Sequence, residues 1–258
     1  MRFLKTIAVT VIGAAICFCA GCSSTAPTST EPAEPGHIKA NVKTSFNPTV
    51  DDPVIDKTAF VDPMASVIGN AEIAGKVYVG PFASIRGDEG QPIYVGEGSN
   101  VQDGVVLHGL ETEENNEPVE KNQVEYAGKK YSVYVGKNVS LAHQCQVHGP
   151  ALVDDGTFIG MQALVFKAQV GKNCVVEPGA RLLNGVKVAD GHYVPAGKVV
   201  TTQAEADKLP VITETYPMKN LNKGVLHVNE QLAEGYLGGG HEESAAGGEA
   251  KTEEPTQH

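Results

Sequence analysis

Three histidines lie at defined positions relative to a six-residue repeat. His108 and His148 each directly follow a repeated aliphatic residue, and His143 lies five residues before His148. His108 and His148 are 40 residues apart, and without a 22-residue insert between them 18 residues remain, one coil of three six-residue sides. We therefore predict that His108 and His148 stack at one corner of neighbouring coils. Neighbouring strands lie ~4.8 Å apart, so both imidazoles can reach one metal ion.

A metal ion held by three histidines with an open fourth position is typical of catalytic sites. Such a metal lowers the pKa of a bound water to about 7 and supplies hydroxide at neutral pH. His143 stands on the preceding side of the coil, so we expect a neighbouring copy to supply it in a homotrimer. Three imidazoles and a water suit Zn(II), Fe(II) or Co(II), one divalent ion per site.

The competing interpretation is that these are ordinary surface histidines. The shared register of His108 and His148, with His143 close in sequence, favours the metal site. The remaining histidines have no such register, and we expect none of them to bind the metal: His37, His192, His227, His241 and His258.

Polar side chains near these histidines could orient a hydroxide and carry its proton away. Asn100 and Gln102 flank Val101, one hexapeptide before His108, and Glu89 and Glu111 are carboxylates close in sequence. The alternative for the two glutamates is ordinary solvated loop charge. We accept that alternative for Glu113, Glu114 and Glu117 of the same acidic stretch.

The elements that must position these groups follow from the repeat. A strict period of six predicts a hexapeptide β-solenoid in which short strands form the sides of a triangular prism. We assign residues 49–200 to this domain and residues 110–131 to an acidic, turn-rich loop inserted in it; a loop of that length is usually functional or disordered. The repeated aliphatic residues are Val67, Ile73, Val79, Ile85, Val95, Val101, Leu107, Val135, Leu141, Val147, Val153, Ile159, Val165, Val170, Val176, Leu182, Val188, Val194 and Val200.

The pattern changes after the last repeat. We predict a C-terminal helical segment over 201–236, with a short helix at 203–209 and a longer one at about 217–236. An apolar stripe of Val225, Val228, Leu232 and Tyr236 would pack the longer helix on the outside of the prism. Residues 237–258 are acidic and glycine-rich, and we expect a disordered tail.

The N-terminal residues have the pattern of a targeting segment. Residues 1–22 combine basic residues, an apolar run and a lipobox-like end, which predicts a signal peptide with Cys22 as a lipidated first residue. Plain signal cleavage remains open, and a membrane anchor fits less well because the apolar run is shorter than the ~20 residues that span a bilayer. Residues 23–48 read as a flexible Ser/Thr/Pro/Glu tether. We expect an exported protein of the cell envelope, either lipid-anchored on the outer side of the cytoplasmic membrane or periplasmic or secreted.

The composition argues against one class of partner, and the spacing of the cysteines predicts their environment. A net charge of −11 argues against nucleic acid, whose phosphates attract an excess of lysine and arginine. Cys145 and Cys174 both fall four residues after a repeated aliphatic residue, and we expect them to be buried, free thiols.

Longer segments resemble one known family. Residues 84–90, 99–108 and 140–150 closely resemble the gamma-class carbonic anhydrases of the archaeal and bacterial type with an acidic loop, and 158–163, 203–210 and 232–236 continue the match. The resemblance covers about residues 50–236. It implies an all-β, left-handed parallel β-helix with a C-terminal α-helix packed on its outside, assembled as a homotrimer. It also implies reversible hydration of carbon dioxide to bicarbonate and a proton.

The same resemblance implies roles for individual residues. The metal ligands would be His108, His143 and His148, with His143 from the neighbouring subunit. The resemblance implies proton transfer by Glu89 and Glu111, positioning of hydroxide and substrate by Gln102 and Asn100, a pocket residue in Asn229, and an intersubunit ion pair of Arg86 with Asp88. Gly87 stands where a small polar residue is common.

Two other functions fit the same fold. A hexapeptide acyltransferase would use one histidine as a general base, whereas this chain has three metal-competent histidines. A non-enzymatic scaffold built on the same trimer would lose a ligand or the shuttle glutamate. The chain keeps both, which favours an active enzyme.

Overall fold

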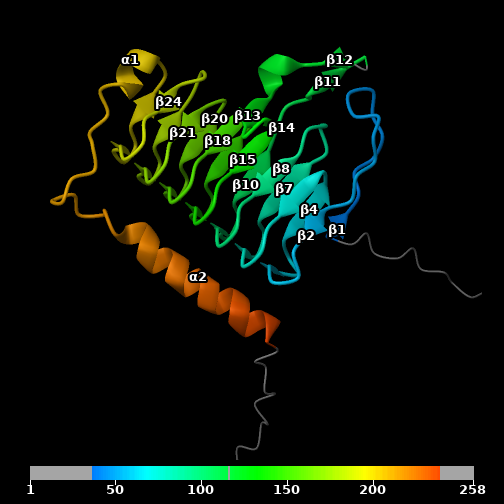
Figure 1. Ribbon diagram of the computed structural model, residues 1–258, viewed down its shortest axis with the longest axis horizontal. Coiled ribbons are helices and arrows are strands. Elements are labelled where there is room, and N and C mark those ends of the chain that lie inside the picture. The colour runs from blue at the N-terminus through cyan, green and yellow to red at the C-terminus, as the bar shows by residue number, and fades with distance from the viewer. Residues whose placement is uncertain (1–36, 116, 239–258) are drawn as a thin grey trace, which may run out of the picture. The chain divides into compact units, whose positions relative to one another are not determined.

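Short parallel strands stack into three sheets, which form the sides of a solenoid in the computed structural model (Figure 1). The structure describes residues 37–115 and 117–238. The parallel solenoid predicted from the six-residue period is therefore confirmed. The predicted signal peptide, residues 23–36 of the predicted tether and residues 239–258 of the predicted tail lie outside the described residues.

Each sheet collects one side of successive coils. The first sheet contains, in spatial order, β1 (Ile38–Lys39), β4 (Ser66–Gly69), β7 (Ser84–Gly87), β10 (Val106–His108), β17 (Gln146–His148), β20 (Leu164–Phe166), β23 (Arg181–Leu182) and β26 (Val199–Val200). The second contains β2 (Val54–Ile55), β5 (Ala71–Ile73), β8 (Ile93–Val95), β15 (Val133–Val135), β18 (Ala151–Val153), β21 (Gln169–Val170) and β24 (Lys187–Val188). The third contains β3 (Phe60–Val61), β6 (Tyr78–Val79), β9 (Asn100–Val101), β16 (Ser140–Leu141), β19 (Phe158–Ile159), β22 (Val175–Val176) and β25 (Tyr193–Val194).

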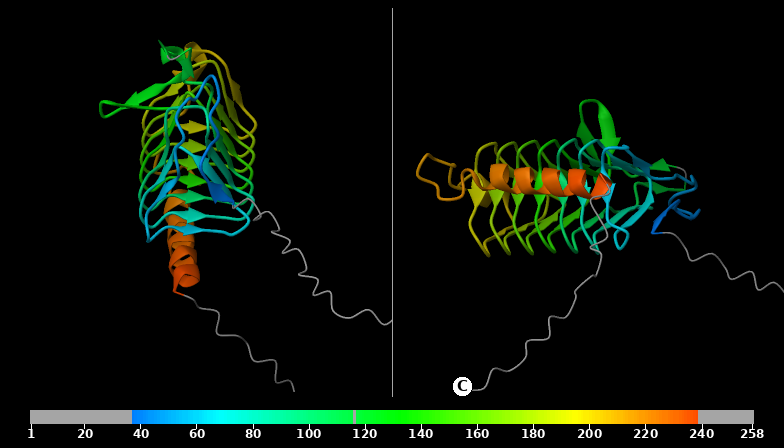
Figure 2. Two further views of the ribbon diagram at one scale, coloured as in Figure 1. Left: turned by 90° about the vertical axis from the view of Figure 1, so that its right-hand side faces the viewer. Right: turned by 90° about the horizontal axis from the view of Figure 1, so that it is seen from below.

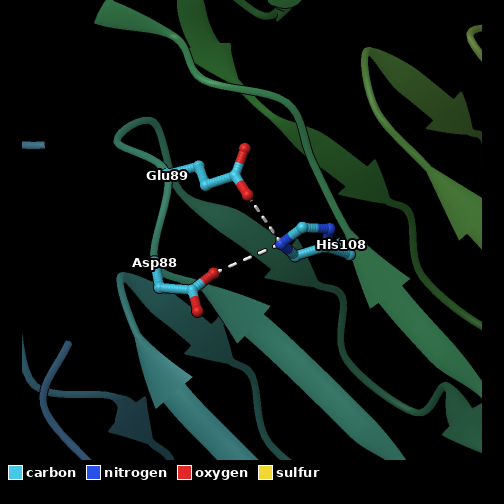
Figure 3. Close-up of side chains that lie close together, drawn as sticks. All are labelled: Asp88, Glu89 and His108. Atoms are coloured by element: carbon cyan, nitrogen blue, oxygen red, sulfur yellow. Dashed lines mark ion pairs between the residues drawn. The ribbon is translucent and has the colours of Figure 1, made fainter. Parts of the chain in front are cut away.

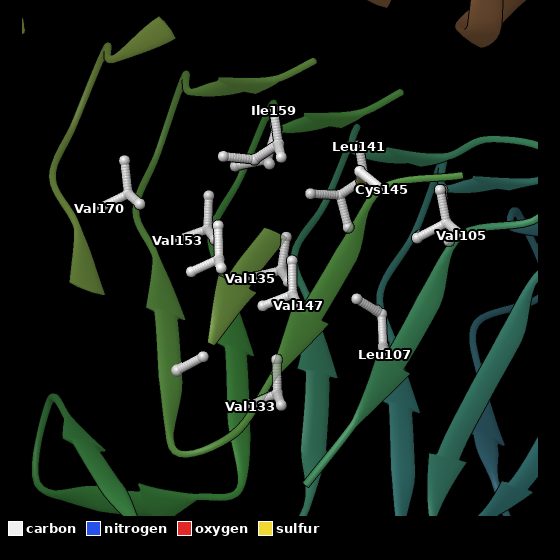
Figure 4. Close-up of a cluster of buried hydrophobic side chains, with 14 of the residues drawn as sticks. Val105, Leu107, Val133, Val135, Leu141, Cys145, Val147, Val153, Ile159 and Val170 are labelled. Carbon is white, nitrogen blue, oxygen red and sulfur yellow. The ribbon is translucent and has the colours of Figure 1, made fainter. Parts of the chain in front are cut away.

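The repeated aliphatic residues fill the inside of the coils. Side chains alternate between the two faces of a strand, so the residue that points inward in one coil lies above its counterpart in the next. Leu107 pairs with Val147, for example, and both are fully buried. Figure 4 shows this layered packing around Leu107, Val135 and Leu141. Cys145 and Cys174 are buried and free, as predicted.

The insertion at 110–131, predicted as an acidic, turn-rich loop, is folded. It contains two short antiparallel hairpins, β11 (Glu113–Glu114) with β12 (Glu117–Pro118) and β13 (Val124–Tyr126) with β14 (Lys129–Tyr131), separated by a 3₁₀ turn at Glu120–Asn122. The second hairpin buries Val124 and Tyr131 against Tyr134 and Leu152, on the outer face of the second sheet. Apolar side chains among the charged ones therefore fix the insertion on the solenoid.

The predicted tether is too long at its C-terminal end. Residues 37–48 are placed in the structure, where β1 pairs in parallel with β4 at the edge of the first sheet. The Asn41 side chain is buried and bonds the backbone of Thr49 and Asp51. This segment covers the edge strand of the first coil, which would otherwise expose unpaired backbone groups.

Two helices follow the last coil. α1 (Gln203–Ala206) begins with a capping box of Thr202 and Glu205 and ends earlier than predicted, where the chain turns toward Pro210. α2 (Leu221–Leu237) also starts later than predicted, because residues 217–220 form a turn.

The longer helix lies on the outside of the solenoid, as predicted, and runs along several coils of the third sheet (Figure 2), but Val228 and Leu232 of its predicted apolar stripe are exposed. The Tyr236 ring stacks on Phe60 with 4.8 Å between ring centroids, and Leu221 and Val225 pack beside Phe158. None of the helices in the described part of the chain has the length and apolar character needed to cross a membrane.

Candidate functional site

His108 and His148 lie side by side at the ends of β10 and β17. They are direct partners in the parallel register of the first sheet, so the predicted stacking on neighbouring coils is confirmed. Their ring centroids are 5.2 Å apart, and 3.4 Å separates the nearest ring nitrogens, Nδ1 of His108 and Nε2 of His148. Two nitrogens that bind one tetrahedral zinc at ~2.1 Å lie about 3.4 Å from each other. The separation of these two nitrogens therefore matches that of two ligands of one metal ion.

Three charged groups face the other nitrogen of the His108 ring. Its Nε2 lies 2.8 Å from Arg86 Nη2, 3.1 Å from Glu89 Oε1 and 3.3 Å from Asp88 Oδ1. Figure 3 shows the two carboxylates converging on this nitrogen. A guanidinium only donates hydrogen bonds and a carboxylate only accepts them, so the protonation of Nε2 selects the partner. A carboxylate beside the remote nitrogen is the usual way in which a metal-binding imidazole is oriented.

The electrostatics of the two carboxylates differ. Burial raises the pKa of Glu89, and the negative charges of Asp88 and Glu111 add to the rise, whereas His108 and Arg86 oppose it. The hydrogen bond with His108 lowers the pKa of Asp88. Of the two, Glu89 is thus the carboxylate that holds a proton more readily.

The folded insertion brings Thr112, the residue after its first glutamate, into contact with Glu89. Thr112, directly after the exposed Glu111, donates to the Glu89 carbonyl from its backbone nitrogen and from its Oγ1, each at 3.0 Å. The Oγ1 also accepts a hydrogen bond from the Gln91 nitrogen at 2.7 Å. Our sequence interpretation missed Thr112, since no spacing or repeat distinguishes it from the polar residues around it.

The remaining predicted residues gather at another corner. His143, Gln102 and Asn229 line a groove of about 680 Å³ whose other walls are largely apolar, including Phe158 and Val225. The groove lies where α2 covers the third sheet. We call His143, Gln102 and Asn229 the groove site, and His108, His148, Arg86, Asp88 and Glu89 the histidine-pair site.

Hydrogen bonds fix the polar wall of the groove site. Gln102 Nε2 donates to Asn100 Oδ1 at 2.9 Å, and Asn100 Nδ2 donates to Ser140 Oγ at 2.8 Å. Asn100 lies buried behind Gln102 and does not line the groove. Asp103 Oδ2 lies 3.7 Å from His143 Nδ1, a neighbour that sequence reasoning also missed although it directly follows Gln102.

One chain does not unite the two sites. His143 lies in the turn at residues 143–144 that precedes β17, whereas His148 is the last residue of β17. Within residues 37–115 and 117–238, the group of donor atoms close enough for one ion consists of Asp88, Glu89 and His108. Among the described residues, one chain therefore does not bring His143 together with His108 and His148.

The predicted ion pair of Arg86 and Asp88 also has an arrangement within one chain. Arg86 Nε lies 3.4 Å from Asp88 Oδ2, both at the end of β7. Their pairing between subunits stays a prediction.

Several curated proteins are similar to this chain over most of its described part. A carbonic anhydrase of Methanosarcina thermophila is 60% identical over 201 residues, which are 78% of this chain and 81% of that protein. The carboxysome assembly protein CcmM of a Nostoc species is 40% identical over 75% of this chain and 33% of its own length. Gamma carbonic anhydrase 1 of Arabidopsis thaliana mitochondria is 33% identical over 57% of this chain and 46% of its own length.

Solved structures share the fold alone. A putative acetyltransferase of Bacillus cereus superposes with a TM-score of 0.54 at 18% identity, over 73% of this chain and 93% of that one. No family model matches the sequence.

Proposed function

Because this chain belongs to the gamma-class carbonic anhydrases, we propose that it catalyses the reversible hydration of carbon dioxide to bicarbonate and a proton. The observation that carries the proposal is the 3.4 Å separation of His108 Nδ1 and His148 Nε2, with Glu89 Oε1 3.1 Å from the other nitrogen of His108. Acyl transfer has only the shared fold in its favour, and a fold hosts many chemistries.

We propose that a divalent metal is held by His108 and His148 of one subunit and His143 of the next. When bound, such an ion supplies Lewis-acid activation of a water molecule near neutral pH. Zinc, iron(II) and cobalt(II) all accept imidazole donors, so the donor set leaves the metal open. A cyclic homotrimer joins each histidine-pair site to a neighbour's groove site and leaves none of these half-sites over.

Other side chains of the protein orient the substrate and transfer the proton. The groove presents mainly apolar walls to an uncharged substrate, with Gln102 and Asn229 as polar groups that orient it. Asn100 supports Gln102 from behind. Glu89 receives the released proton beside His108, and Glu111, which is exposed, passes it to buffer.

Stopped-flow measurement of CO2 hydration tests the proposal. The protein would be purified without oxygen, stripped of metal, and reloaded separately with zinc or iron(II). We expect turnover to rise at least about a thousandfold on loading, the order expected when an ion activates water. A metal-loaded trimer that does not hydrate CO2 would contradict the proposal and leave the scaffold or acyltransferase functions.

Glu111→Gln is expected to lower kcat about 10- to 100-fold when buffer is scarce, and to leave kcat/KM nearly unchanged. The reason is that proton release follows the formation of bicarbonate. Glu114→Gln is the matched control, because Glu114 is an exposed glutamate of β11 that we assign to solvated charge. Equal kcat values for the two variants would remove Glu111 from the proton path.

A further inference from the structure

A buried threonine joins the acidic insertion to the turn that carries Glu89. Only 2% of the Thr112 surface is exposed, although its neighbour Glu111 faces solvent. The Thr112 hydroxyl donates to the Glu89 carbonyl at 3.0 Å and accepts from the Gln91 nitrogen at 2.7 Å. One side chain thus bonds the backbone on both sides of Gly90.

Gly90 is the residue that permits this close approach. Its φ of +106° lies in a region that favours glycine, and a Cβ at this position would overlap the Thr112 Oγ1. The turn and the insertion are therefore shaped for each other at this contact.

The turn is held by side chains from three separate segments. The backbone carbonyls of residues 88, 89 and 90 each accept one side-chain hydrogen bond. Asn47 donates to the first at 3.1 Å, Thr112 to the second, and Asn70 to the third at 2.9 Å. Of the three donors, only Thr112 belongs to the insertion, where it directly follows Glu111.

The insertion is closed around the same residue. The Thr112 carbonyl accepts from the Val119 nitrogen at 2.8 Å and from Gln123 Nε2 at 3.0 Å. Asn122 Nδ2 donates to the neighbouring Glu111 carbonyl at 2.7 Å. The position of Glu111 is thus set on one side by its own loop and on the other by the hydroxyl of Thr112.

From these contacts we infer that Thr112 is a positioning residue for proton transfer, holding Glu111 at a fixed place relative to Glu89. The inference rests on the proposed function, because it assigns a purpose to the contact between Thr112, which follows one proposed proton carrier, and the backbone of the other, Glu89. Thr112 forms no hydrogen bond with His108, His143 or His148 and does not line the groove. It acts through the two glutamates.

Thr112→Val tests the inference, because valine has nearly the same shape and removes both hydroxyl hydrogen bonds while the backbone N–H remains. At low buffer concentration kcat should fall about tenfold, part of the 10²- to 10⁴-fold that placed proton carriers contribute. The kcat/KM for CO2 should stay unchanged, and concentrated imidazole buffer should restore much of the lost kcat. Thr112→Ser keeps the hydroxyl and should retain the wild-type kcat.

Thr157→Val is a matched control for general destabilisation. Thr157 is fully buried, and its hydroxyl donates to the Gly171 carbonyl at 2.7 Å and accepts from the Cys174 nitrogen at 3.0 Å. The substitution thus removes the same pair of bonds from a hydroxyl whose partners, Gly171 and Cys174, belong to neither site. Adding Thr112→Val to Glu111→Gln should cause little further loss of kcat, since the two changes affect one step.

Each outcome decides the matter. A fall in kcat alone, specific to Thr112→Val and reversed by serine and by buffer, would support the inference. Three results would overturn the inference and leave the proposed function standing, provided that the wild-type protein is active. They are equal effects of Thr112→Val and Thr157→Val on kcat, a fall in kcat/KM equal to the fall in kcat for Thr112→Val, and an unchanged kcat for Thr112→Val. A metal-loaded wild-type protein without CO2 hydration would overturn both.

Discussion

Replacing His108 with alanine is expected to empty the metal site and to lower kcat/KM for CO2 hydration by at least about a thousandfold. His108 provides one of the two nitrogens that lie 3.4 Å apart, and its loss also leaves Asp88 and Glu89 without the imidazole that faces both. Metal content per chain and stopped-flow hydration measure the two effects.

The fold should survive this change. The His108 side chain points out of the solenoid, whereas the neighbouring Leu107 fills the core. His227→Ala is the matched control, because His227 lies exposed on α2 and has no place in the repeat register. A His108→Ala protein that kept both its metal and its turnover would refute the assignment of this ligand.

Mixing two inactive variants is expected to restore activity. His108→Ala and His143→Ala chains should each be inactive alone, and equal amounts assembled together should reach about one quarter of wild-type turnover. The reason is that each site needs an intact His108 from one chain and an intact His143 from its neighbour. Random pairing satisfies both conditions at one interface in four. Differently tagged chains, refolded together and assayed as the unseparated mixture, allow the measurement, and the tags show that mixed trimers have formed.

A second mixture provides the control. His108→Ala with His148→Ala should remain inactive, because both residues belong to the histidine-pair site and no chain in the mixture has both intact. If the first mixture also stayed inactive, the site would not be shared between chains. Restoration in the control mixture would place His108 and His148 in different half-sites, against their pairing in the first sheet.

The coils of the solenoid could be predicted because they repeat. Each side of a narrow prism needs an inward-pointing aliphatic side chain, and this requirement produces a six-residue period in the sequence. The same counting paired His108 with His148 across 40 residues, since each coil returns the chain to the same corner. The burial of Cys145 and Cys174 followed from the same register.

Other parts of the site have no period to reveal them. Thr112 reaches Glu89 because the insertion folds back on the solenoid, and Asn47 reaches the same turn from a segment that reads as a tether. The second hairpin of the insertion is fixed by a few apolar contacts, such as Tyr131 with Tyr134, among many charged residues. These contacts depend on three-dimensional closure and not on local pattern.

The sequence by itself thus determined the solenoid and the stacked histidine pair, because both follow from residue spacing along a regular coil. The tertiary structure decided the division of the predicted residues into a histidine-pair site and a groove site, and the contact that holds Glu111 near Glu89. The physical reason is that a repeat places residues only relative to its own axis. Where irregular segments meet that axis depends on packing and hydrogen bonds formed after folding.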